Sequence, residues 1–286
     1  MNKAPVSIGS EYTSSDEDQH NLAIAATNNV KARKYWKRKL SGALTKTTIP
    51  YEGERIKDNK AVFEDIEYKL SPLLSTELFR LSNHSNNRLH LILVAGLNAL
   101  LHKYSSEDSS DIIIGVPIHK QDEVGELVNT VLPIRNQVES GTTFKQLLLK
   151  IRQTYIEAID YQNFPIQLLP NELEITDADY GFPLFDICIL LKNIHNIKYL
   201  EGVSHSITMS FQRTGEFMDL SIRYDTSRYL KSNIHRIANQ FEQLLTSALE
   251  DVSRRIGDLI MITDKEKKQL LHDFNNTKSD YLKEIP

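Results

Sequence analysis

The apolar positions between Asp111 and Gln137 fall into two short runs separated by a polar loop. The first run, Ile112 to Ile114, ends at Gly115 and Pro117, and the second leads into Val131. Short apolar runs bounded by glycine, proline and polar residues are typical of buried strands. The pattern therefore predicts two strands joined by a loop, with a sheet at the centre of the fold.

One amide side chain, Asn129, lies among the aliphatic residues that open the second run. A buried amide that makes no hydrogen bonds costs free energy, so this side chain must find partners. Backbone groups of a neighbouring segment are the simplest partners. We expect Asn129 to have a structural role rather than to contact a substrate.

Helical periodicity alternates with strand patterns along the rest of the chain. The stretch LHLILVAGLNALLHKY, Leu89 to Tyr104, is apolar nearly all round, which predicts a helix buried on more than one side. Ser71 is expected to cap a helix that has Pro72 at its first position. The other predicted helices are Val30 to Leu40, a segment capped by Thr142 or Thr143 that ends near Tyr161, Leu230 to Leu249, and a last one from Thr263 or Asp264 to about Asp273.

Alternation at Ile66, Tyr68 and Leu70 predicts a half-exposed strand. Three later segments are also strongly β-forming, namely Phe185 to Ile194, Ser206 to Phe211 and Phe217 to Tyr224. Since helices and strands are interleaved, we predict an α/β fold with a mixed β-sheet covered by helices. Residues 1 to 28 are polar and lack periodicity, and we expect them to be a disordered leader.

Composition narrows the possible functions. A net charge of −4 gives no general attraction to nucleic acid or to anionic membranes, and neither is an expected partner. The basic stretch from Lys31 to Lys39 fits a solvated amphipathic helix. The one cysteine, Cys188, lies among aliphatic residues, as a buried thiol does in a reducing compartment. With no signal peptide and no apolar run of spanning length, we expect a cytoplasmic protein.

Most catalytic signatures are absent from the sequence, including glycine-rich phosphate loops, GxSxG and HExxH, and no metal site is predicted. His119 is the candidate to weigh, because it follows a strand end and Glu123 lies four residues on. A general base oriented by a carboxylate is one interpretation. The other, which we favour, is a solvated histidine in a polar loop, so no catalytic residue is assigned.

Seven motifs in order resemble the C-terminal half of a condensation domain of nonribosomal peptide synthetases. They are YWKRKLSG, HKYSSEDSSDIIIGVPI, VGELVNTVLPIR, YQNFPIQLLP, FPLFDICILLKN, MDLSIRYDTSRY and ITDKEKKQLLHDFNNT. The resemblance implies a chloramphenicol acetyltransferase-like single lobe over residues 29 to 274. Residues 275 to 286 resemble the linker that approaches an adenylation domain.

In that family two such lobes enclose a tunnel that admits the phosphopantetheine arms of two carrier proteins. The catalytic HHxxxDG motif belongs to the N-terminal lobe, and the resemblance implies that this chain lacks it. The segment HKQDEVG, which begins at His119, is not a match, because it has Glu123-Val124 where Asp-Gly would be needed.

The resemblance also assigns candidate positions. Those at the tunnel or the lobe interface are Asn129, Thr130, Pro133, Arg135, Gln162 and Pro165, and those with structural roles are Gly115, Asp186 and Asp225. The segment YQNFPIQ departs from the family's HQDxPFE pattern at Tyr161, Asn163, Ile166 and Gln167.

Two functions remain open from the sequence. One is a partial condensation domain that is unable to form amide bonds by itself and binds no cofactor of its own. The other is a non-catalytic platform that packs on an adenylation domain, a peptidyl carrier domain or an N-terminal lobe. A lobe without its counterpart should expose apolar surface, so we expect self-association or a covering partner.

Overall fold

The computed structural model describes residues 29–42, 44, 47–50, 61–105, 107–120, 128–173 and 184–262. The expected leader at residues 1–28, the last predicted helix and the linker at 275–286 lie outside these described residues, as does Glu123.

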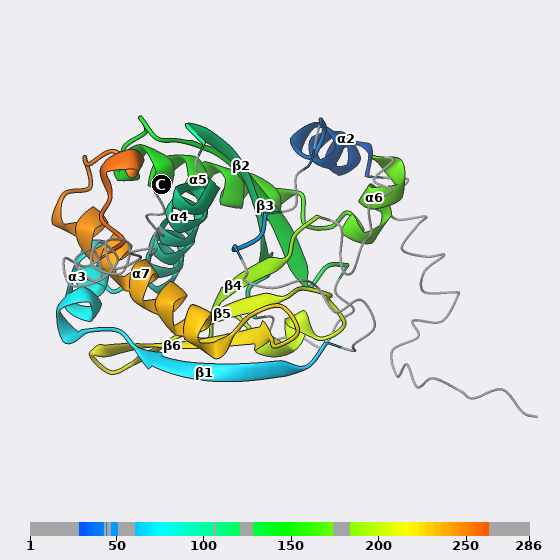
Figure 1. The fold of residues 1–286 in the computed structure, drawn as a ribbon. Helices are drawn as coiled ribbons and strands as arrows, with labels where there is room; N and C mark the ends of the chain where they lie inside the picture. Colours follow the sequence, from blue (N-terminus) through cyan, green and yellow to red (C-terminus); the bar gives the residue numbers. More distant parts are fainter. Residues whose placement is uncertain are drawn as a thin grey trace, which may run out of the picture.

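The described strands form one six-stranded sheet in the order β1-β6-β5-β4-β2-β3 (Figure 1). β4 pairs with β2 and with β5 in parallel, and the other pairs are antiparallel. The sheet is therefore mixed, as predicted. The strands are β1 (Phe63–Lys69), β2 (Ser109–Pro117), β3 (Val131–Glu139), β4 (Ile187–Leu191), β5 (Ile207–Thr214) and β6 (Phe217–Asp225).

Helices pack against this sheet, and Figure 1 shows α4 and α7 crossing it while α2 and α6 lie together at one end. The predicted helices within the described residues are all present. The α-helices are α2 (Val30–Lys39), α3 (Pro72–Ser82), α4 (Asn86–Ser105), α5 (Phe144–Asp160), α6 (Leu169–Glu172) and α7 (Lys231–Glu250), and the 3-10 turns are η1 (Ile166–Leu168), η2 (Ile197–Leu200) and η3 (Ile256–Asp258).

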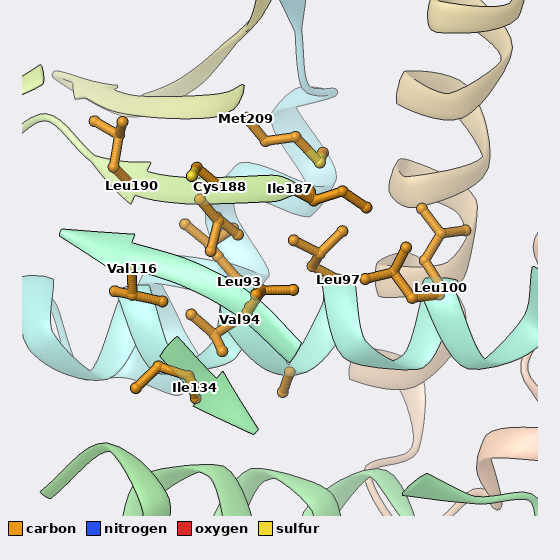
Figure 2. Packing of buried hydrophobic residues seen from close by; sticks show 14 of the residues in the cluster. Leu93, Val94, Leu97, Leu100, Val116, Ile134, Ile187, Cys188, Leu190 and Met209 are labelled. Atoms are coloured by element: carbon orange, nitrogen blue, oxygen red, sulfur yellow. The ribbon is translucent and has the colours of Figure 1, made fainter. Parts of the chain in front are cut away.

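α4 is buried on more than one side, as its apolar sequence predicts. Leu97 of α4 points toward Ile187 of β4 in Figure 2, and both side chains are fully buried. On another side of the helix, a Cβ at Gly96 would lie 2.7 Å from a methyl carbon of Leu245 in α7. Glycine at this position therefore lets the two helices approach closely.

The two apolar runs between Asp111 and Gln137 form the antiparallel pair β2 and β3, with Gly115 opposite Pro133. A Cβ on Gly115 would lie 2.5 Å from the ring of Phe185 and 2.7 Å from the sulfur of Cys188. The close contact of β2 with β4 therefore requires glycine at this position. Cys188 itself is fully buried, as expected.

Local capping follows the sequence. The Ser71 hydroxyl accepts a hydrogen bond from the Leu74 amide at the start of α3. Thr143, rather than Thr142, caps α5, because its side chain and that of Gln146 form a reciprocal capping box. One strand prediction is too long: β4 ends at Leu191 because the chain turns there, and the amide of His195 donates to the carbonyl of Leu191 at 2.9 Å.

We predict that Gly115→Ala lowers the free energy of unfolding by about 1–3 kcal/mol, the usual cost of overpacking a buried site. Urea denaturation of the purified protein measures the change. Gly141→Ala is the matched control, since a Cβ there would meet no atom within 4 Å. Equal losses in the two variants would show that the β2 and β4 contact tolerates a methyl group.

Candidate functional site

Asn129 connects the chain entering β3 to the segment that follows α5. Its amide nitrogen donates to the carbonyl of Gln162 and, at 2.7 Å, to the carbonyl of Phe164. Its amide oxygen accepts from the backbone N–H of Ile166 at 3.0 Å. With 4% exposure, Asn129 has the backbone partners that a buried amide requires.

The same segment is also held by α2. The indole N–H of Trp36 donates to the carbonyl of Tyr161 at 2.9 Å. The ring of Tyr35 stacks on the ring of Tyr161, with centroids 4.5 Å apart. Tyr161, one of the departures from the family pattern, therefore has a packing partner. Pro165 then sets the extended backbone that begins η1.

Arg135 is engaged inside the protein rather than left open toward a ligand. Its guanidinium makes a bidentate ion pair with Asp111 on the neighbouring strand β2, in which Nε donates to Oδ1 and Nη2 to Oδ2. It also donates to the carbonyls of Lys39 at 3.2 Å and Ser41 at 2.7 Å, at the end of α2. Through these bonds Arg135 connects the β2–β3 pair to the end of α2.

The remaining motif positions lie along the same pair of strands. Thr130 is half-buried, and its carbonyl accepts from the amide of Ile118 at 3.0 Å. Pro133 lies opposite Gly115. The side chain of Asn129 thus bonds the backbone of the segment that contains Gln162 and Pro165, whereas Arg135, in the middle of β3, bonds the end of α2.

A buried ion-pair network joins the ends of β4 and β6. Asp186, which is 1% exposed, receives Nη1 of Arg228 at 3.0 Å and the hydroxyl of Ser206. Asp225 lies 3.6 Å from Nε of Arg228 and accepts from the amide of Ser227 at 2.9 Å. Both carboxylates are thereby paired, as buried charges must be.

Sequence reasoning marked Asp186 and Asp225 as structural positions but missed Arg228. The signal was available, because a carboxylate embedded in FPLFDICILL needs a cation, and Arg228 stands three residues after the other aspartate.

His119 differs from the solvated loop residue favoured by the sequence. It is half-buried, it forms an isolated antiparallel bridge with His195, and its ring centroid lies 5.4 Å from that of His195. Burial lowers the pKa of His119. The reason for the correction is tertiary, since the chain after β4 returns beside the end of β2.

The described residues contain no group of three His, Cys, Asp or Glu side chains with a geometry that could hold a metal ion. Among the described helices, none has the length and apolar character needed to cross a membrane.

The class of protein follows from a family match over most of the chain. The family model for the condensation domain matches residues 12–271, and the chain belongs to this family. Among curated proteins, tyrocidine synthase 2 of Brevibacillus parabrevis is 30% identical over 86% of this chain, which spans 7% of that protein. Gramicidin S synthase 2 of Brevibacillus brevis is 28% identical over 88% of this chain and 6% of its own length.

Solved structures share the fold at low sequence identity. A four-domain nonribosomal peptide synthetase bound to AMP and glycine matches 88% of this chain and 21% of its own, with a TM-score of 0.72 and 16% identity. The X-domain in complex with OxyB from teicoplanin biosynthesis matches 87% of this chain and 60% of its own, with a TM-score of 0.70 and 14% identity. These likenesses confirm the predicted fold class.

We predict that Asn129→Ala lowers the free energy of unfolding by about 1–3 kcal/mol, because two carbonyls and one N–H would be left unpaired in the core. Amide hydrogen exchange at Ile166 should also become faster. Asn163→Ala is the control, since Asn163 is exposed in the same segment. If both variants unfold at the same urea concentration, Asn129 does not hold this segment.

Asp186→Asn should lower the free energy of unfolding by about 3 kcal/mol, the lower end of the range for breaking a buried ion pair, because Arg228 keeps its contact with Asp225. Thermal and urea denaturation at pH 7 measure the loss. Glu77→Gln provides the control, since the Glu77–Arg80 pair lies at the surface and should contribute little to stability. Similar losses in both variants would contradict a structural role for the buried network.

Proposed function

We propose that these residues form the C-terminal lobe of a condensation domain that acts in nonribosomal peptide synthesis. The observation that carries the proposal is the family match over residues 12–271. The extent of structural overlap supports it. The first condensation domain of the calcium-dependent antibiotic synthetase matches 87% of this chain but 58% of its own length, with a TM-score of 0.64.

In this proposal the segment held by Asn129 forms part of the tunnel wall at the lobe interface. Two facts support the assignment: the amide uses its bonding capacity on the backbone of residues 162–166, and Phe164 and Ile166 are buried beside it. Asn129, Pro165 and Arg135 would then shape the wall by positioning backbone, with no contact to the reacting atoms.

The chemistry would come from elsewhere in the intact domain. The sequence contains no HHxxxDG motif, and the hydrogen bonds of His102, His195 and His205 go to hydroxyls and backbone groups. We propose that an N-terminal lobe supplies the catalytic histidine and that phosphopantetheine arms of peptidyl carrier domains deliver the two aminoacyl or peptidyl units. An adenylation domain would be the partner at the C-terminal end.

A reconstitution experiment tests this function. The chain is mixed with the N-terminal lobe of the condensation domain that it matches in tyrocidine synthase 2 and with two carrier proteins loaded with aminoacyl groups. Mass spectrometry of the acceptor carrier should detect a dipeptidyl thioester only when both lobes are present. Replacing the second histidine of HHxxxDG by alanine in the N-terminal lobe should reduce the product to background.

The controls separate the alternatives. Each lobe alone should give no product, and size-exclusion chromatography should show a complex of the two. Product from this chain alone, lost in His119→Ala, would instead indicate a self-contained acyltransferase. If neither a product nor a complex is detected, completion by a second lobe is contradicted and the non-catalytic platform is favoured.

A further inference from the structure

Four aromatic side chains from separate parts of the fold meet near the ends of β2 and β4. His90 comes from α4 and Tyr155 from α5, whereas His119 follows β2 and His195 follows β4. The ring centroids of His90 and His195 are 4.5 Å apart, and those of His119 and His195 are 5.4 Å apart. Tyr155 lies 5.7 Å from His90 and 6.1 Å from His119.

The inner two histidines are buried with little polar compensation. His90 and His195 are each 1% exposed. Within the described residues, neither ring nitrogen of His90 has a hydrogen-bond partner, and the same holds for Nε2 of His195 and the hydroxyl of Tyr155. Such surroundings tolerate a neutral imidazole far better than an imidazolium, whose two N–H groups and charge would be left without acceptors.

The backbone around His195 also depends on the neutral ring. Nδ1 of His195 accepts a hydrogen bond from the backbone N–H of Leu191 at 3.1 Å. A proton on Nδ1 would point at that N–H, and the bond would be lost. The adjacent contact between strands, in which the amide of Lys120 donates to the carbonyl of Ile194 at 2.9 Å, lies beside this turn.

Charge builds up unfavourably as the cluster takes up protons. Burial, together with the charges of His119 and Lys120, lowers the pKa of His195 to about 3. Burial likewise lowers the pKa of His90, which is decreased again by His195 and His119. On His90 and His195, the charge effects from the described residues thus come from imidazoles and an ammonium. His119 is the least buried of the three and should accept a proton first.

We propose that this histidine cluster is an acid-sensitive clasp that joins the ends of β2 and β4. With the imidazoles neutral, the rings pack together and the bridge between His119 and His195 stays closed. When protons enter, the like charges and the lost Leu191 bond open this bridge before the rest of the sheet unfolds. The clasp is independent of the proposed function, because its tests measure stability and local opening.

The direction of the pH effect follows from the pKa shifts. His90 and His195 have pKa values in the fold below their ordinary value of about 6.5, so the unfolded chain binds more protons in acid. Their neutral packing contributes full stability above about pH 6.5, and this stability is lost as the pH falls below that value. Below about pH 6.5, each buried imidazole should raise the unfolding equilibrium constant about tenfold for each unit by which the pH falls. The two imidazoles together should raise it about a hundredfold.

Urea denaturation of the full chain between pH 7.5 and pH 5.0 tests the clasp. His90→Phe keeps the aromatic volume and removes one titrating ring, and His195→Asn keeps an acceptor for the Leu191 N–H. Below about pH 6.5 the unfolding equilibrium constant of each variant should rise about tenfold for each pH unit of acidification, instead of about a hundredfold as in the wild type. His235→Gln, at an exposed position on α7, is the control and should keep the wild-type dependence. Unchanged pH dependence in both cluster variants would overturn the proposal.

Local opening gives a second measurement on the wild-type chain alone, which decides the matter if a variant fails to fold. Amide hydrogen exchange should show protection at Lys120 and His195 falling at least tenfold between pH 7 and pH 5, after correction for the intrinsic exchange rate. The amide of Ile114, in the middle of β2, should stay better protected than both amides at every pH in this range, because it exchanges only when the sheet itself unfolds. Equal behaviour of the three amides would mean that no clasp opens ahead of the sheet.

Discussion

The burial of β2 on both faces is the constraint from which the rest of the architecture follows. This strand lies between β3 and β4, and its residues from Ile112 to Pro117 are all buried. β4 can approach it closely because Gly115 leaves space for Phe185 and Cys188. α4 then covers the apolar surface of the two strands (Figure 2). A strand without this packing would expose a row of isoleucines to water, at a cost of about 25 cal/mol for each Å².

Several polar groups enter this core where geometry provides partners for them. The side chain of Asn129 makes the hydrogen bonds that join the start of β3 to the backbone of residues 162–166. Arg228 compensates the charges of Asp186 and Asp225 where three strand ends meet. Arg135 neutralises Asp111 and takes the backbone of α2 as a further partner. These side chains favour the observed packing of the segments, because a different packing would leave their buried polar groups unpaired.

The histidine cluster follows the opposite principle. His90 and His195 are buried where the described structure offers few acceptors, so their stability depends on remaining uncharged. Their contact with His119 extends that dependence from the core toward the surface. The chain after β2 and the chain after β4 are therefore joined by rings that must stay uncharged, whereas the start of β4 is held by the paired charges of Asp186 and Arg228.

Much of this protein was determined by the sequence alone. Periodicity predicted the positions of the strands and of the longer described helices, the α/β class and the buried character of α4, because those features depend on neighbours within a few residues. Seven ordered motifs indicated the family that the comparison confirms. The partners of Asn129, the role of Arg228 and the meeting of His90, His119 and His195 were decided only by tertiary structure. The residues concerned are between 33 and 37 positions apart for Asn129 and 42 for Asp186, and no local pattern encodes contacts at such separations.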